Sequence, residues 1–390
     1  MLRWQEVGSR QSKLVLTALI CVVAMASLPL NMVNVAIPTI GDYYDATQTQ
    51  LNMVAVSYSL GLACSVLWLG ALGDRYGRKL MMLLGVTLTI PAALISAFAP
   101  IVDILIVGRL ITGFAAGMAY PTTLSLITAL WAPGPERTRA IAVWVGTGVA
   151  ITVSGPLLSG ILLENYYWGS IFLVIIPLAL VALVMGFRYI PAHINESRKP
   201  VDNVGGILSL LLIGTFVLAL NFLPFPGYRV FTSQLLLASF GAALLFLYRQ
   251  RRAKNPLYDL AVAGRRIFWV AGLSGLIVFG SLMGGMYIGQ QFLQDVLGYS
   301  TVEAGLAVIP LGIFILLATP GSAKVIQTRG TRLALLGGFL LLLLGYLLML
   351  LLWNENSSYP LIGLTYALVG LGIGLAGTPS SRALTGSVPI

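Results

Sequence analysis

One arginine stands apart among the residues of this chain that could do chemistry. Arg109 lies inside a long apolar run, six residues beyond Asp103, which puts it about 9 Å deeper if the run is a helix. A charge at that depth in a bilayer costs at least roughly 2.5 to 3.5 kcal/mol, so it needs a partner or a cavity. We therefore take Arg109 as a candidate functional residue. A purely structural role, in which the guanidinium binds backbone carbonyls, is the alternative.

A second candidate is the charged segment Gly70–Lys79, which reads Gly-Ala-Leu-Gly-Asp-Arg-Tyr-Gly-Arg-Lys and joins two apolar runs. Its glycines let two helix ends approach closely, and Asp74 can accept hydrogen bonds at a helix N-terminus. Its bases, Arg75, Arg78 and Lys79, favour the basic side of a bilayer. An ordinary positively charged turn is the alternative, but acid, glycines and bases at this spacing are more specific.

Membrane-spanning helices must position these residues. With 58% hydrophobic and 9% charged residues, the 390-residue chain has too little polar surface for a soluble globule. Uncharged apolar runs of about 20 residues indicate helices, whereas a membrane barrel would show short alternating segments. We expect an all-α polytopic membrane protein. Its twelve predicted spans lie near 14–40, 51–73, 79–99, 102–131, 139–163, 169–189, 205–225, 231–248, 267–293, 302–322, 332–353 and 360–381.

The basic residues predict how the chain crosses the membrane. A cytoplasmic N-terminus places 21 of the 23 lysines and arginines on the cytoplasmic side, all except Arg109 and Arg229. The net charge of +10 is therefore interpreted as a topology signal in the cell membrane, and nucleic acid is not expected as a partner.

Several other sequence features favour simple structural explanations. A secretory signal cleaved near Ala24–Ala26 is an alternative for the first run, but the run continues long enough to span a bilayer. Cys21 and Cys64 lie in apolar runs, and the single histidine, His193, has no second ligand near it in sequence. We expect no disulfide and no metal site.

The charged segment resembles the signature of the major facilitator superfamily of transporters, Gly-x-Leu-x-Asp-Arg-x-Gly-Arg-Lys between helices 2 and 3. Every fixed position is present, including Gly77. The resemblance implies two helical bundles that rock around a central cavity, with the charged turn latching one conformation. Arg109, with Gly113 and Gly117, resembles the family's motif in span 4 and is thereby linked to proton transfer. Asp103 or a group outside this sequence would then accept the proton, or coupling would be absent.

An internal repeat predicts how the spans are grouped. Gly330–Arg332 and Gly338 echo Gly77–Lys79 and Gly85 at an offset of 253 residues, and this repeat follows span 10. Spans 7 and 8 are therefore interpreted as an inserted pair. The predicted domains are an N-terminal six-helix bundle (1–190), the inserted pair with its linker (191–252), and an incomplete C-terminal bundle of four helices (253–390).

This plan resembles the fourteen-span drug:proton antiporter branch of the superfamily, which has six, two and six spans. Local similarities at Pro200–Gly205, where the inserted pair begins, and at Tyr299–Pro310 support the resemblance. It implies that two further helices follow residue 390. Whether they exist in this protein is open at this point.

Small residues around a proline form a third motif, in span 5. Gly155, Pro156, Ser159 and Gly160 resemble the antiporter motif Gly-Pro-x-x-Gly-Gly, with Ser159 in place of the first of its two final glycines. Such a face lets helices pack closely, and the proline permits a bend. A packing face in any membrane bundle is the alternative.

Span 1 departs from the branch that it resembles. Pro29 stands where relatives commonly carry an embedded aspartate, and Asn31 and Asn34 can bind a ligand by hydrogen bonds but cannot titrate. Interhelical hydrogen bonding is their alternative role. By analogy with the fold, six polar residues are candidate walls of a central cavity: Asn31, Asn34, Tyr120, Tyr287, Gln290 and Gln291.

Together these features predict a secondary transporter that exports lipophilic small molecules by alternating access, with a proton gradient as the expected driving force. Its expected partners are a small-molecule substrate, protons and membrane lipid. No nucleotide-binding loop or catalytic constellation is present, so we expect neither a cofactor nor an enzyme. Two alternatives stay open. One is an exporter of a neutral or anionic metabolite or lipid, and the other is a non-transporting relative or scaffold.

Overall fold

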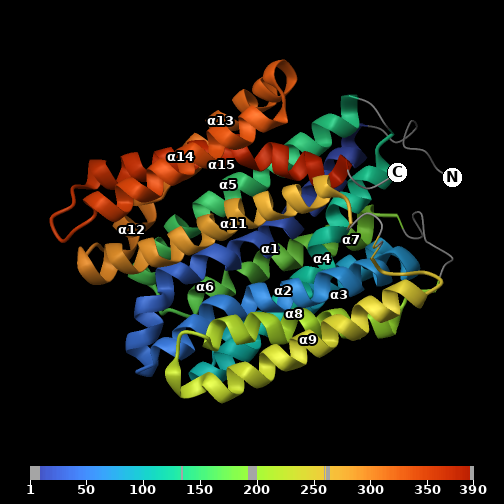
Figure 1. Ribbon diagram of the computed structural model, residues 1–390, viewed down its shortest axis with the longest axis horizontal. Helices are drawn as coiled ribbons and strands as arrows, with labels where there is room; N and C mark the ends of the chain where they lie inside the picture. Colours follow the sequence, from blue (N-terminus) through green and yellow to red (C-terminus); the bar gives the residue numbers. More distant parts are fainter. Residues whose placement is uncertain (1–8, 133–134, 192–199, 259, 261–263, 387–390) are drawn as a thin grey trace. The chain divides into compact units, whose positions relative to one another are not determined.

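The protein is built from membrane-length helices. The computed structural model describes residues 9–132, 135–191, 200–258, 260 and 264–386, and every regular element within them is a helix (Figure 1). Eleven of the described helical segments are long and apolar enough to cross a membrane. The 31-residue helix α5 covers the one predicted span that is not among them. The elements are α1 (Ser9–Tyr44), α2 (Gln48–Tyr76), α3 (Arg78–Ala97), α4 (Val102–Leu130), α5 (Pro135–Asn165), α6 (Ser170–Leu173), α7 (Ile175–Tyr189), α8 (Asn203–Phe222), η1 (Pro226–Tyr228), α9 (Arg229–Arg252), α11 (Arg266–Gln291), η2 (Phe292–Val296), α12 (Thr301–Ala307), α13 (Ile309–Arg329), α14 (Thr331–Leu352) and α15 (Tyr359–Gly386).

Short polar residues determine where some of these helices begin. Thr47 precedes α2 and accepts a hydrogen bond from the backbone N–H of Gln50, whose side chain accepts one from the N–H of Thr47. Ser300 and Glu303 form the same reciprocal pair at the start of α12. These caps satisfy N–H groups that the first turn of a helix leaves unpaired.

The chain divides into two compact units. The first comprises Met1–Leu30, Thr39–Gly148 and Tyr167–Tyr258. Apolar residues of α1, α3, α4 and α7 form its core, Val22 and Met82 among them. Helix α2 packs on α4 and on α8, and α8 lies beside α9 (Figure 1). The inserted pair is therefore a helical hairpin of this first unit.

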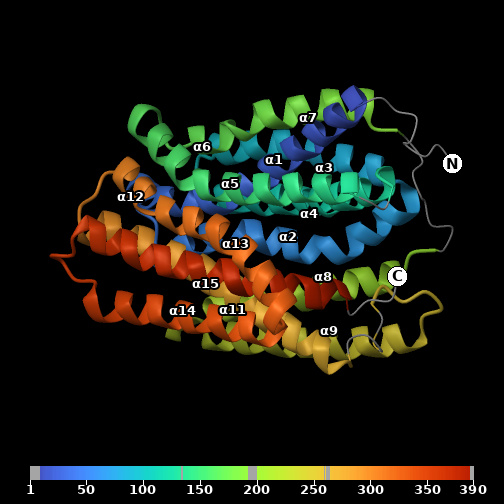
Figure 2. The ribbon, with the colours of Figure 1, turned by 90° about the horizontal axis from the view of Figure 1, so that it is seen from above.

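The second unit comprises Asn31–Pro38, Val149–Tyr166 and Asp259–Ile390. Its helix α15 packs on α11, α13 and α14, and Figure 2 shows α13, α14 and α15 side by side. Apolar residues of these helices, including Leu311 and Val369, form its core. The predicted domain boundaries after residues 190 and 252 stay predictions.

The internal repeat is visible in the backbone. Gly77 and Gly330 each form a one-residue break between two helices, with φ angles of 113° and 86°. Residues with a side chain rarely adopt such angles, so both turns require glycine. The turn from α2 to α3 therefore has a counterpart of the same design between α13 and α14.

Close contacts between helices repeat as well. Gly113 of α4 lies against the backbone of Tyr58 in α2, and Gly370 of α15 lies against the backbone of Leu311 in α13. The same relation recurs one turn further on, where Gly117 meets Ser65 and Gly374 meets Ala318. Because small residues let helix backbones approach, these glycines set the distance between the paired helices. The pair α13 and α15 thus repeats the packing of α2 and α4.

Candidate functional site

Protein atoms enclose the charge of Arg109. Its side chain projects from α4 and is 1% exposed. Its Nε–H donates to the carbonyl of Val54 at 2.6 Å, and its guanidinium carbon lies 5.9 Å and 5.8 Å from the ring centroids of Tyr58 and Phe172. Among the described residues, its Nη2 has no hydrogen-bond partner. One carbonyl and two aromatic faces therefore stabilise the cation, and part of its donor capacity is unused.

Asp103 does not share the buried environment of Arg109. It is exposed in the first turn of α4. Six residues correspond to about one and two-thirds helical turns, so the two side chains point roughly 120° apart. Within the described part of the chain, Arg109 forms no ion pair with an acid. A role of Asp103 in proton transfer stays a prediction.

Tyr58 connects this site to a third helix. Its hydroxyl donates to the carbonyl of Ala26 in α1, at 2.5 Å, and its ring is completely buried. Sequence reasoning missed this residue, because a single tyrosine in an apolar run belongs to no motif. One signal was available: Val54, Tyr58 and Gly61 are spaced four and three residues apart and so share a helix face.

The second unit has a neutral residue at the position equivalent to Arg109. Tyr366 lies four residues before Gly370, as Arg109 lies four residues before Gly113. Its side chain is buried, and its hydroxyl has no hydrogen-bond partner within the described ranges of the chain. The repeat thus places a partly unsatisfied polar group at both positions, but a charge only in the first unit.

The charged turn forms a local ion pair. Arg75 lies in the last turn of α2, which ends before Gly77. Arg78, the first residue of α3, binds Asp74 through its Nε and Nη2, at 3.0 Å and 2.9 Å from the same carboxylate oxygen. The two residues are half-buried and exposed, respectively, so this pair holds the geometry of the turn more than it adds stability.

The same turn is fastened to other helices of the first unit. Arg78 Nη1 donates to the carbonyl of Ser125 in α4 at 3.0 Å. Lys79 Nζ donates to the carbonyl of Phe187 in α7 at 2.8 Å and lies 5.4 Å from the centroid of that ring. The signature therefore connects α2, α3, α4 and α7. Its role as a conformational latch stays a prediction.

The proline motif of α5 packs against α12 in the second unit. Gly160 lies against the backbone of Thr301, whose hydroxyl donates to the carbonyl of Gly160 at 3.1 Å. A Cβ at Gly305 would lie 2.8 Å from the carbonyl oxygen of Pro156. Ser159, which replaces a glycine of the motif, is buried and donates to the carbonyl of Met32 at 2.7 Å. Gly155 is buried in the same helix.

The asparagines of α1 face the protein interior. Asn31 Nδ2 donates to the carbonyl of Thr152 in α5 at 3.3 Å, whereas its buried Oδ1 has no partner among the residues that the structure describes. Asn34 is also buried. Hydrogen bonding between helices, the alternative that the sequence left open, therefore accounts for one end of the Asn31 amide. Ligand binding by the other end stays a prediction.

The candidate cavity residues of α11 are engaged within the second unit. Gln290 is buried and donates to the carbonyl of Ala304 at 2.9 Å. Its neighbour on the same face, Gln294, donates to the carbonyl of Val35 in α1 at 3.0 Å. Gln291 is half-buried and lies 3.5 Å from the hydroxyl of Tyr287. The last candidate belongs to the first unit: Tyr120, with its ring 5.7 Å from that of Trp144.

The amino-acid sequence matches a known protein family over nearly its whole length. The profile of the Major Facilitator Superfamily matches residues 19–389. The chain belongs to the major facilitator superfamily. As a member, it is a multi-pass membrane protein.

Three curated relatives match this chain with about the same sequence identity. The multidrug resistance protein Stp of Mycobacterium tuberculosis is 30% identical over 94% of this chain and 68% of its own length. The multidrug efflux pump LfrA of Mycolicibacterium smegmatis is 30% identical over 94% of this chain and 74% of its own. The methyl viologen resistance protein SmvA of Salmonella typhimurium is 30% identical over 96% and 76%.

Among solved structures, the peptide transporter POT in complex with sulfate superposes with a TM-score of 0.71. The match covers 96% of this chain and 82% of the transporter at 16% sequence identity. At that identity the likeness concerns the fold and not the substrate.

Proposed function

We propose that this protein is a secondary transporter that exports lipophilic small molecules across the cell membrane by alternating access, driven by a proton gradient. The observation that carries the proposal is the unpartnered Nη2 of Arg109. A purely structural arginine in a membrane helix would fill its donors with carbonyls, whereas this one has a single carbonyl partner in the part of the chain that the structure describes. A donor left free inside the bundle is available for a water, a proton carrier or a rearranged carbonyl during transport.

The relatives support the export of drugs. Stp, LfrA and SmvA are named for multidrug resistance, multidrug efflux and resistance to methyl viologen. In the proposed cycle the turn at Asp74 stabilises one conformation, α5 bends at Pro156, and Arg109 changes its partners. The proposed substrate contacts are the polar side chains of the candidate cavity: Asn31, Asn34, Tyr120, Tyr287, Gln290 and Gln291.

A second candidate is the export of a neutral or anionic compound. It is favoured by the sign of the buried charge: Arg109 is positive, and Pro29 provides no embedded acid in α1 to attract a cation. A neutral or anionic substrate would need no such acid. The two candidates share the same fold and cycle and differ only in the substrate.

The test is efflux from cells that express the chain, with a lipophilic cationic dye and a lipophilic anionic dye measured in parallel. We expect at least one dye to leave these cells faster than cells carrying an empty vector, and a protonophore to abolish the difference. The dye that is exported decides between the two candidates. If the protein is present in the membrane and neither dye nor any of a panel of antibiotics is exported, the protein is the non-transporting scaffold.

A further inference from the structure

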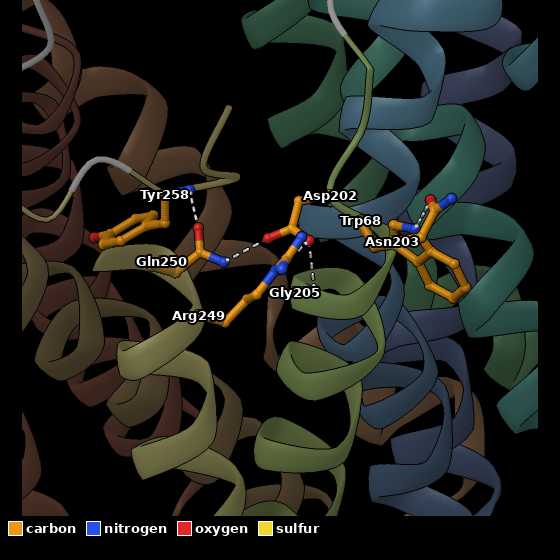
Figure 3. Close-up of polar contacts among 7 residues, drawn as sticks. All are labelled: Trp68, Asp202, Asn203, Gly205, Arg249, Gln250 and Tyr258. Carbon is orange, nitrogen blue, oxygen red and sulfur yellow. Dashed lines mark hydrogen bonds and ion pairs between the residues drawn. The ribbon is translucent and has the colours of Figure 1, made fainter. Parts of the chain in front are cut away.

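The segment at the start of α8, Asp202-Asn203-Val204-Gly205-Gly206, holds a network of polar contacts that the transport site does not use (Figure 3). It begins the inserted hairpin of α8 and α9, which belongs to the first unit. Asp202, Asn203, Gly205 and Gly206 all take part in these contacts. Together these contacts explain why the segment has this sequence.

Asp202 closes the open end of the hairpin. Its side chain is 3% exposed, and its Oδ1 accepts from the backbone N–H of Gly205 at 3.1 Å, which caps α8. The same oxygen accepts from Arg249 Nε at 2.9 Å, and Oδ2 accepts from Gln250 Nε2 at 3.2 Å, both in α9. A Cβ at Gly205 would lie 2.5 Å from Oδ2 and from the Gln250 amide. Glycine is therefore needed to make room for the carboxylate.

The network continues to the end of the first unit. Gln250, which donates to Asp202, accepts with its Oε1 from the backbone N–H of Tyr258 at 3.1 Å. Tyr258 is the last residue of the unit. Figure 3 shows the resulting line of contacts from Asp202 through Gln250 to Tyr258, with Arg249 on the same carboxylate. Asp202 thus fixes both the hairpin and the point where the chain leaves the unit.

Two neighbouring residues dock the hairpin on α2. Asn203 Oδ1 accepts from Trp68 Nε1 at 3.1 Å, as Figure 3 shows. Gly206 lies directly against the indole ring of Trp68, so a side chain there would collide with it. The hydrogen bond and the missing side chain together seat the tryptophan on the start of α8.

Contacts between α8 and α2 continue along most of their length. Gly214 faces the Cys64 thiol, and a Cβ there would lie 3.4 Å from Sγ. Further along, Asn221 Nδ2 donates to Met53 Sδ at 3.3 Å. Positions on α2 fall from 68 to 53 as those on α8 rise from 203 to 221, which is an antiparallel register over about 22 Å. A helix held at both ends and in the middle cannot slide or pivot without losing several contacts.

We propose that Asp202–Gly206 is a lock that closes the α8 and α9 hairpin and fastens it to α2, so that the hairpin travels with the first unit through the whole transport cycle. The docking rests on contacts within the first unit, and its role during transport rests on the proposed function. Asp202 is a positioning residue: it acts through Arg249, Gln250 and the start of α8.

A cross-link between α2 and α8 tests whether the hairpin leaves α2 during transport. In a variant with Cys21→Ser, the substitution Gly214→Cys places a second thiol beside the native Cys64, at a spacing close to that of a disulfide. An oxidant that takes up two electrons and two protons should couple the two thiols. We expect roughly tenfold more coupling than in a control with Gly241→Cys on α9, where an added Cβ meets no atom within 4 Å. Loss of maleimide labelling measures the coupling.

The cross-linked transporter should export its dye at a rate within about twofold of the reduced form. Coupling followed by loss of efflux, reversed by dithiothreitol, would show that the hairpin must separate from α2 and would overturn the proposal. Failure to couple in a folded protein would overturn the docking itself. If the uncoupled protein exports nothing, the proposed function fails, but the coupling yield still decides the docking.

A second variant tests Asp202 without depending on transport. Asp202→Asn keeps the shape of the side chain but removes the charge that binds Arg249. We expect amide hydrogen exchange at Gly205 and Tyr258 to become about tenfold faster, while exchange in α4 is unchanged. The matched control is Asp103→Asn, an exposed acid in the first turn of a helix, which should leave these amides as they are. Unchanged exchange in Asp202→Asn would contradict the lock.

Discussion

Replacement of Arg109 with methionine is expected to reduce efflux to the level of an empty vector while the protein folds at least as stably as the wild type. Methionine fills a similar volume without a charge, and it removes a desolvated cation that has a single carbonyl partner. The Val54 carbonyl that loses its donor lies inside α2 and can keep its helical hydrogen bond. Dye efflux and thermal unfolding in detergent, measured on the same preparations, check the two halves of this prediction.

The repeat provides a matched control. Tyr366→Phe removes an equally buried polar group without a partner from the equivalent position of the second unit. Because the phenol carries no charge and forms no hydrogen bond with any described residue, efflux should be retained. Unchanged gradient-dependent efflux in Arg109→Met would remove Arg109 from the mechanism. Loss of folded protein in Arg109→Met, in contrast, would assign it the structural role.

Replacement of Gly113 with valine is expected to cause the largest loss of folded protein among single substitutions in the first unit. A Cβ at this position would collide with the backbone of Tyr58, which cannot move aside as a flexible side chain could. Overpacking typically costs about 1 to 3 kcal/mol, and a clash with backbone belongs at or above the upper end. The separation of α2 and α4 would displace Tyr58 from Arg109, so any folded fraction should also export poorly. Membrane yield and melting temperature in detergent measure the effect.

The control for this substitution is Gly241→Val in α9, where an added Cβ meets no atom within 4 Å. Both changes replace a helical glycine with the same β-branched residue, so they share the effect on helix propensity and differ in packing. If Gly241→Val lowers the melting temperature as much as Gly113→Val does, the effect at position 113 comes from helix propensity. The close approach of α2 and α4 would then not be the reason for glycine at that position.

The spans and the repeat could be predicted because hydropathy and glycine spacing are properties of the chain itself. Uncharged apolar runs predicted the helices, and the echo of Gly77 at Gly330 predicted a repeated turn, at which the structure has a positive φ in both copies. Both signals come from the cost of polar groups in a bilayer and from the conformational freedom of glycine. They do not depend on how any helix is rotated about its axis.

The direction in which individual side chains point could not be predicted, because it depends on how each helix is rotated about its axis. Lipid-facing and protein-facing positions are both apolar, so hydropathy does not show which face of a span is buried. Asp103 was considered as a proton acceptor for Arg109, and hydropathy did not show that its side chain is exposed on another face of α4. Gln290 was predicted to line a cavity; its amide donates to the carbonyl of Ala304, a contact that hydropathy does not show, and its role in a cavity stays a prediction.

Contacts between segments that are far apart in the sequence could not be predicted either. The partner of Asn203 is Trp68, 135 residues earlier, and no motif links the two. The sequence around Asp202 resembled the start of an inserted pair of helices. Only the contacts with α2 and α9 show why these residue types are needed there. Likewise, Ser159 in place of a motif glycine has its explanation in the carbonyl of Met32.

The most direct test of the account is substrate movement by the purified chain in proteoliposomes with an imposed pH gradient. We predict that a lipophilic dye moves against its own concentration gradient when the pH gradient is present, and that protons move in the opposite direction. Both fluxes should vanish in Arg109→Met and persist in Tyr366→Phe. Dye movement at the same rate with and without the pH gradient would contradict proton coupling. No movement of any substrate by correctly folded protein would contradict the central claim that this chain is a transporter.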